Sequence, residues 1–166
     1  STLMRSSAAS DVYKRQELGN TDMAWTLINK VRCRAGATEV NAANYNAIYH
    51  KAGMYNLVKL DEAGNETGQA FIADNDEQGK VRTALYWERG FELAFEGQRK
   101  YDLIRWGVLK DALVRFGTKC HFNKGTNKGY PAYINFVEGK HQLFPIPLIE
   151  IQSNGLLEGK NNPGYN

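Results

Sequence analysis

The chain has 166 residues, of which 42% are hydrophobic, 11% aromatic and 23% charged, a composition that fits one globular domain and excludes a disordered or fibrous chain. Its 21 basic and 18 acidic residues are scattered and leave a formal net charge of +3, so no polybasic block favours nucleic acid as a partner. No apolar run reaches the length of a membrane span, and no signal segment opens the chain. If the protein is exported, we expect its signal to lie outside this sequence.

The first 16 residues, STLMRSSAASDVYKRQ, differ in character from the rest. They show almost no apolar periodicity, and their Ser/Ala-rich composition changes abruptly at residue 17. We interpret residues 1–16 as a non-native or disordered segment and leave them out of the fold prediction. Residues 17–166 carry the folded part of the chain.

An amphipathic helix is predicted over residues 21–36. Apolar side chains recur there at helical spacing: Ala24, Leu27, Ile28, Val31 and Ala35. Asn20 or Thr21 can cap its start, and Gly36 can cap its end. Two further basic residues, Arg32 and Arg34, fall in its last turn, where positive charge is favourable.

Residues 38–80 give mixed signals. The stretch NAANYNAIYHKAG suggests a helical turn or two, and MYNLVKL and QAFIAD are typical of strands on either side of the turn-rich DEAGNETG. We therefore predict a small β-hairpin. The following DNDEQGK begins like a calcium loop, but its twelfth position is Leu85, where a bidentate Glu is required. A solvated turn is the favoured interpretation.

A central helix is predicted from Val81 to Gly97. Apolar residues recur along it at helical spacing: Val81, Ala84, Leu85, Phe91 and Phe95, of which Val81, Leu85 and Phe95 mark the side expected to face the core. Trp87, Phe91 and Leu93 widen the apolar surface beyond one stripe, so partners should cover this helix on most sides.

Two short helices, RKYDLIRW and VLKDALVRF, should follow, with breaks at Gly97, Gly107 and Gly117. A long loop comes next, over GTKCHFNKGTNKGYPAYIN. The end of the chain should be extended through Pro145, with Pro147 at the first position of a short helix and a turn at NNPGYN. The elements together predict a mainly α fold with a small β-hairpin and long loops.

The charged residues of ERGFELAFEGQRKYDLIRWG, residues 88–107, allow two interpretations. Glu88 and Glu92 fall on the core side of the central helix, where an unpaired carboxylate is too costly to persist. Arginines lie nearby, and four pairs have the i, i+3 spacing that lets side chains meet. We interpret the set as a structural ion-pair cluster that clamps helices together, with Arg99 bridging carboxylates: Glu88, Arg89, Glu92, Glu96, Arg99, Asp102 and Arg105.

The alternative is a glycoside hydrolase that uses Glu88 or Glu92 with Glu96 as acid and nucleophile. A plausible arginine partner for each acid argues against it, because such a partner removes the protonated acid that the mechanism needs. No catalytic residue is therefore assigned. His50, His121 and His141 are far apart, without a Ser or Cys in a nucleophile-elbow setting.

No metal site or cofactor is predicted either. Cys33 and Cys120 lack metal-ligand spacing, and the sequence leaves open whether they pair or remain free thiols. Five tyrosines offer flat faces on which a sugar ring can stack, although each is more often a packing residue: Tyr45, Tyr49, Tyr55, Tyr130 and Tyr133.

Three stretches of the chain resemble the C-terminal part of the RagB/SusD family: INKVRCRAG, ERGFELAFEGQRKYDLIRWG and LFPIPLIEIQSNGLLEGKNNPGY. The middle stretch is the most specific, because the family pattern is E-R-x-x-E-L-x-x-E-G-x-R-x-x-D-L-x-R-W. The residues that fit this pattern are Glu88, Arg89, Glu92, Leu93, Glu96, Gly97, Arg99, Asp102, Leu103, Arg105 and Trp106.

The resemblance implies a SusD-like helical fold with tetratricopeptide-like helix pairs, held by a lipid anchor on the outer face of the outer membrane. Such proteins bind oligosaccharides, or in some members peptides, for a SusC-like TonB-dependent transporter, and they are not enzymes. Residues 17–166 then correspond to the C-terminal part of such a domain, and the lipid anchor is absent from this chain. Family ligand contacts lie largely upstream, so none is carried over. A helical-repeat adaptor that binds protein remains an alternative.

Overall fold

The computed structural model describes residues 19–50, 57–61, 63–119 and 131–165. By its contacts the chain divides into two compact units, residues 1–102 (unit 1) and 103–166 (unit 2), with the boundary inside one helix. Helices dominate the described residues, and the one sheet among them has two strands, so the prediction of a mainly α fold is confirmed. None of the helices in the described part of the chain is long and apolar enough to cross a membrane.

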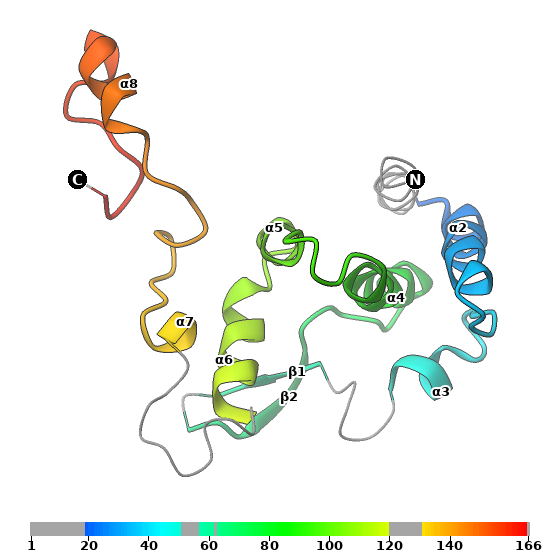
Figure 1. The fold of residues 1–166 in the computed structure, drawn as a ribbon. Helices are drawn as coiled ribbons and strands as arrows, with labels where there is room; N and C mark the ends of the chain where they lie inside the picture. The colour runs from blue at the N-terminus through cyan, green and yellow to red at the C-terminus, as the bar shows by residue number, and fades with distance from the viewer. Residues whose placement is uncertain (1–18, 51–56, 62, 120–130, 166) are drawn as a thin grey trace. The chain divides into compact units, whose positions relative to one another are not determined.

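The elements follow in chain order (Figure 1): α2 Thr21–Arg34, α3 Tyr45–Tyr49, β1 Val58–Leu60, β2 Glu66–Ala70, α4 Glu77–Glu92, α5 Arg99–Arg105, α6 Leu109–Lys119, α7 Pro131–Ile134, α8 Leu148–Ser153 and the 3₁₀ helix η2 Gly155–Leu157. The predicted helical turn in residues 41–53 is α3, and the two short helices predicted after Gly97 are α5 and α6.

Helix α2 begins and ends close to the predicted residues. The Asn20 side chain accepts a hydrogen bond from the Met23 backbone N–H at 3.1 Å, which caps the first turn. The helix ends at Arg34, and Gly36 then takes a positive φ of 75°, a backbone conformation that glycine adopts without steric cost. Its buried face comprises Ala24, Trp25, Ile28 and Arg32.

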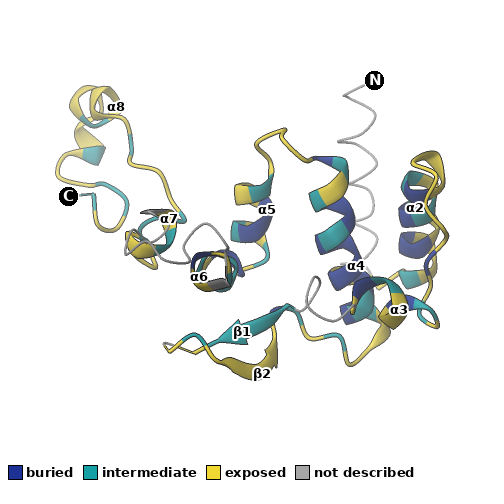
Figure 2. Ribbon diagram, turned by 60° about the horizontal axis from the view of Figure 1, so that its bottom comes forward, coloured by how far each residue is buried: buried dark blue, intermediate teal, exposed yellow. Residues whose placement is uncertain are grey.

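Helix α4 is the centre of unit 1 and contacts both α2 and α3. It begins four residues before the predicted Val81, because the Asp76 side chain accepts from the Gly79 N–H at 2.6 Å and caps an earlier turn. Buried residues run along α2 and α4, as Figure 2 shows in dark blue. The core of unit 1 therefore lies where α2 and α3 meet α4.

The predicted end of α4 at Gly97 is wrong, because the helix ends at Glu92. Phe95 takes a positive φ of 65° and Gly97 one of 73°, so the chain turns sharply before α5. Phe95 was expected to face the core and is instead fully exposed. Beyond the end of a helix, helical spacing no longer determines whether a side chain faces the core or the solvent.

The predicted β-hairpin is present, with a shorter first strand and a shifted second strand: β2 includes residues 66–68 of the predicted turn and ends at Ala70, so residues 71–74 of the predicted strand lie outside it. β1 and β2 pair antiparallel, with Val58 opposite Ala70, Leu60 opposite Glu66, and an irregularity between the two pairs. The Asp61 side chain accepts from the Asn65 N–H at 2.8 Å and closes the turn. Residues 54–56 of the predicted first strand lie outside the described residues.

Unit 2 holds α6, α7 and α8. α6 and α7 are in contact, and a Cβ added at Gly117 would lie 2.4 Å from the Tyr133 ring, so only glycine permits this approach. α7 falls in the stretch predicted as loop. Pro147 was predicted as the first residue of the terminal helix and is instead the N-cap of α8. The predicted turn at residues 162–165 is present, and the Tyr165 N–H donates to the Asn162 carbonyl at 3.1 Å to close it.

Candidate functional site

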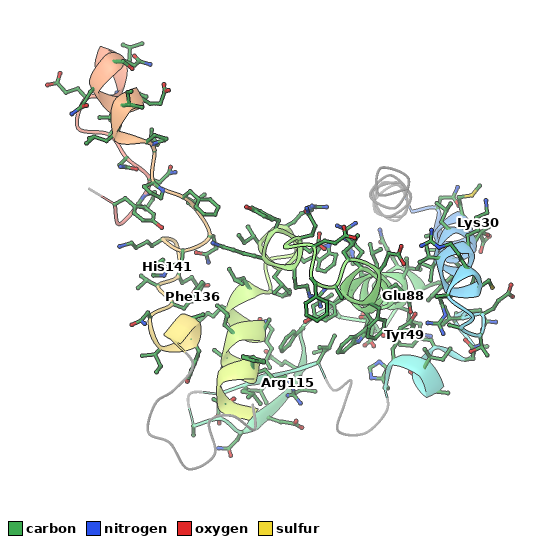
Figure 3. All side chains as sticks on the ribbon, in the orientation of Figure 1. Lys30, Tyr49, Glu88, Arg115, Phe136 and His141 are labelled. Carbon is green, nitrogen blue, oxygen red and sulfur yellow. The ribbon has the colours of Figure 1, made fainter. Side chains whose placement is uncertain are left out.

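Glu88 lies at the centre of a buried polar network in unit 1. Its Oε1 accepts a hydrogen bond from the Tyr49 hydroxyl at 2.6 Å and forms an ion pair with Arg32. Figure 3 shows Tyr49 and Glu88 side by side between α3 and α4. Arg32 also donates from Nε to the Thr38 carbonyl at 2.8 Å, which fixes the plane of its guanidinium. One carboxylate thus ties together α2, α3 and α4.

A second buried pair joins α4 to α5. Arg89 donates from Nε and Nη2 to the two carboxylate oxygens of Asp102, at 2.9 and 2.8 Å. Asp102 is 1% exposed and Arg89 is also buried. This bidentate geometry is the strongest form of a charged hydrogen bond, and it offsets much of the cost of burying both groups.

The remaining members of the cluster lie nearer the surface. Arg34 pairs with Glu92, with 53% of the arginine side chain and 16% of the glutamate side chain exposed. Glu92, expected in the core, is therefore only partly buried, and Glu96 is exposed. Arg99 donates to the Tyr86 carbonyl at 2.7 Å, and its guanidinium lies 3.9 Å from the centre of the Tyr86 ring.

The partners of Glu88 come from far along the chain. Glu88 is held by Arg32 and Tyr49, which sequence analysis did not place in the cluster. One signal for Arg32 existed, because it follows Ala24 and Ile28 at four-residue spacing and so lies on the buried face of α2. No comparable pattern pointed to Tyr49 or Arg34.

A smaller polar cluster connects α3 to the segment before α4. Asp74 Oδ2 accepts from the Tyr45 hydroxyl at 2.8 Å and lies 2.7 Å from His50 Nε2. Burial holds the pKa of Tyr45 well above its ordinary value, and Asp74 adds to the effect. Burial, followed by the charge of Glu88, does the same to the pKa of Tyr49.

The five tyrosine candidates have different positions. Tyr45 and Tyr49 are each 1% exposed, so neither ring is open to a ligand and both are core residues. The Tyr133 ring packs closely on Gly117 and is half-buried. Tyr55 and Tyr130 lie outside the described residues. Among the described residues of unit 1, the large exposed aromatic rings are Phe91, Phe95 and Tyr101. Phe91 stacks on Trp87 with ring centroids 5.9 Å apart.

Within the described ranges, no three His, Cys, Asp or Glu side chains form a group that could hold a metal ion. Asp76, the second acid of the calcium-like loop, caps α4. Cys33 is an exposed free thiol, while Cys120 and His121 lie outside the described residues. His141 accepts from the Val137 N–H at 2.7 Å, far in sequence from the His50 cluster.

These contacts describe an α-helical scaffold protein whose central helix is fixed by arginine–carboxylate pairs. The family model described as the SusD family matches residues 8–165 of this chain, and the chain therefore belongs to that family, as the resemblance predicted. The match begins inside the segment of residues 1–16 that we set apart as non-native or disordered.

One curated relative is "SusD-like protein P25" of Formosa agariphila, which is 34% identical over an alignment 167 residues long that covers 94% of this chain. The alignment covers 24% of the relative, so the chain spans about a quarter of that protein's length. No solved structure matches the chain.

Proposed function

We propose that this chain is part of a nutrient-binding protein that captures oligosaccharides without making or breaking a bond. The protein works beside a SusC-like TonB-dependent transporter and is held on the outer face of the outer membrane by a lipid anchor. Membership of the SusD family and the likeness to a SusD-like relative support this proposal. Residues 17–166 correspond in it to the C-terminal part of the SusD-like domain.

One observation supports binding over catalysis. Glu88, one of the acids that the hydrolase alternative could use, is buried and engaged by Arg32 and Tyr49. A carboxylate that transfers a proton to a glycosidic oxygen must reach that oxygen at hydrogen-bond distance. Substrate cannot reach Glu88 without dismantling the contact between α2, α3 and α4.

A binding experiment on the whole protein tests the proposal. We expect some oligosaccharides of a glycan panel to bind in titration calorimetry and to be recovered intact after prolonged incubation. Affinity should come from aromatic stacking and hydrogen bonds, and Tyr55, Tyr130 and Tyr133 remain candidates for the stacking rings.

Hydrolysis is tested through Glu96, because it is exposed and its loss leaves the buried pairs unchanged. Release of new reducing ends that disappears in Glu96→Gln, with folding intact, would overturn the proposal in favour of a glycoside hydrolase. Binding of a protein but no sugar would favour the adaptor.

A further inference from the structure

Asn154 is the asparagine of this chain that a glycine follows, and it lies at the junction of α8 and η2. The backbone nitrogen of the next residue can attack an asparagine side chain at Cγ, because the two atoms close an unstrained five-membered ring. A side chain on that next residue crowds the nitrogen, and glycine has none. The pair of Asn154 and Gly155 therefore combines an amide with the least hindered backbone nucleophile.

Both residues of this pair are open to solvent. Asn154 and Gly155 are exposed, and a Cβ built on Gly155 would meet nothing within 4 Å. Figure 2 shows α8, which ends at Ser153, coloured largely as exposed. Water can therefore reach the pair while the chain is folded.

A backbone donor holds the side chain of Asn154. Its Oδ1 accepts a hydrogen bond from the Leu156 N–H at 3.1 Å, which caps η2. When a nitrogen adds to Cγ, negative charge develops on this same oxygen, and a backbone N–H that already points at it stabilises the charge. The hydrogen bond that caps η2 is thus also placed to assist attack on the amide.

We propose that Asn154 is a site of spontaneous deamidation in the folded protein, with water as the co-reactant. The Gly155 nitrogen forms a bond to Cγ, and the side-chain nitrogen leaves as ammonia together with the proton of the Gly155 amide. The cyclic imide that remains is opened by water. Attack at the side-chain carbonyl leaves aspartate, and attack at the backbone carbonyl leaves isoaspartate. The reaction does not depend on nutrient binding.

The isoaspartate product changes the junction of α8 and η2. Its backbone is one methylene longer, and the carboxylate takes the place of the backbone carbonyl of Asn154. In the unmodified chain that carbonyl accepts from the Leu157 N–H at 2.8 Å, and the side chain accepts from the Leu156 N–H. Both bonds depend on the original connectivity, so η2 should open and its contact with α8 should be lost.

Two asparagines further along the chain provide internal controls. Asn161 Oδ1 accepts from the Ile146 and Asn162 N–H groups, each at 2.8 Å, and the residue that follows Asn161 carries a side chain. Asn162 precedes Pro163, whose nitrogen has no hydrogen to lose. Neither should react at a comparable rate.

Peptide mapping by mass spectrometry tests the proposal after incubation of the folded chain in a mildly alkaline buffer. We expect aspartate and isoaspartate at position 154, with isoaspartate detected by labelling with a protein isoaspartate methyltransferase, and unchanged Asn161 and Asn162. Gly155→Ala should slow the reaction about tenfold or more, because its methyl group crowds the nitrogen. Gly155 is outside the positive-φ region and has space for a Cβ, so this variant should keep the fold.

The chain unfolded in guanidinium chloride shows whether the fold protects the site. We expect the rate at Asn154 in the folded chain to stay within about tenfold of the unfolded rate, because the residue remains exposed. Amide hydrogen exchange of the isoaspartate fraction, separated by its added negative charge, tests the consequence. Residues 156 and 157 should exchange faster than in the unmodified chain, while α2 should be unchanged.

Four results would overturn the proposal. An intact Asn154 after long incubation, or a folded rate far below the unfolded one, would show that the structure protects this amide. An equal rate in Gly155→Ala, or equal reaction at Asn161, would show that the glycine does not direct the chemistry. Unchanged exchange of residues 156 and 157 in the isoaspartate fraction would contradict the predicted opening of η2 alone.

Discussion

Arg32 extends from α2 into the core of unit 1, where it meets the carboxylate of Glu88 and lies near the Tyr49 hydroxyl. Burying either charge alone would cost several kcal/mol, and the attraction between the two charges offsets much of that cost. Arg34, two residues further on, forms the same type of ion pair with Glu92 at the surface. The two arginines therefore offer a matched comparison of a buried and an exposed pair.

We expect Arg32→Met to destabilise unit 1 by about 3 kcal/mol or more, because it leaves Glu88 buried without its cation. Arg34→Met should cost about 0.5 kcal/mol or less, because solvent screens the exposed pair. Urea unfolding followed by circular dichroism measures both. Equal losses for the two variants would show that the Arg32–Glu88 pair is no more important to the fold than a surface contact.

The buried phenols predict a loss of stability at alkaline pH. Burial, and after it the charge of Glu88, keeps the pKa of Tyr49 above its ordinary value, whereas a tyrosine in the unfolded chain titrates near about 10. The folded state thus retains a proton that the unfolded state releases, and the contribution present below pH ~10 is lost as pH rises further.

Tyr49→Phe should remove that contribution, because phenylalanine does not titrate. Between about pH 10 and 11 the wild-type free energy of unfolding should fall more steeply than that of the variant, by up to about 1.4 kcal/mol per pH unit. Urea titrations at several pH values measure the two slopes. Parallel curves would mean that Tyr49 releases its proton as easily when folded as when unfolded.

Among the elements, α4 contains two glycines, Gly79 and Gly90, with different surroundings. A Cβ at Gly79 would lie 2.0 Å from the Ala73 carbonyl oxygen, so the first turn of the helix packs directly on the preceding backbone. A Cβ at Gly90 would lie 3.4 Å from the Arg99 guanidinium, the movable end of a long side chain.

Gly79→Ala should therefore destabilise unit 1 by about 2 kcal/mol or more, since backbone must move to admit the methyl group. Gly90→Ala should change stability by no more than about 1 kcal/mol, because alanine's higher helix propensity offsets the contact with Arg99. Thermal unfolding of the two variants provides the comparison. A neutral Gly79→Ala would contradict the close approach of residues 73 and 74 to α4.

The end of α4 shows where sequence periodicity loses its meaning. Apolar residues at helical spacing continue to Phe95, yet the helix ends at Glu92. Phe95 then takes a left-handed backbone conformation with a positive φ. Leu93 stays buried while Phe95 does not. The pattern described which residues are apolar, but the turn decided which of them point inward.

At the scale of the whole molecule, the two units differ in how much apolar surface they bury. Unit 1 has a core at the junction of α2, α3 and α4, whereas the buried hydrophobic side chains in the described part of unit 2 are Leu103, Val108 and Leu109. Because burial of apolar surface is the main stabilising term in folding, unit 2 should be the less stable part of this chain.

The tryptophans allow this difference to be measured. Trp25 and Trp87 belong to unit 1 and Trp106 to unit 2, and the chain has three tryptophans. In a Trp25→Phe/Trp87→Phe variant, the fluorescence of Trp106 should change at lower urea than the fluorescence of a Trp106→Phe variant. Coincident transitions would indicate that the chain unfolds as one cooperative unit.

Local patterns in the sequence were sufficient to predict α2, the hairpin, the short helices α5 and α6, and the turn at NNPGYN, because caps, turn residues and periodicity act over a few neighbours. The family could also be recognised from the motif of residues 88–106. The buried position of Glu88 followed from its spacing on α4, although its cation did not.

Only the tertiary structure decided which groups meet. Arg32 reaches Glu88, Arg89 reaches Asp102, Tyr45 and Tyr49 are buried, and Phe95 faces outward. Each of these facts depends on how segments far apart in sequence pack together or on where a helix stops. A charged residue on the core-facing side of a helix shows that a partner is needed, and the folded chain determines which partner lies within reach.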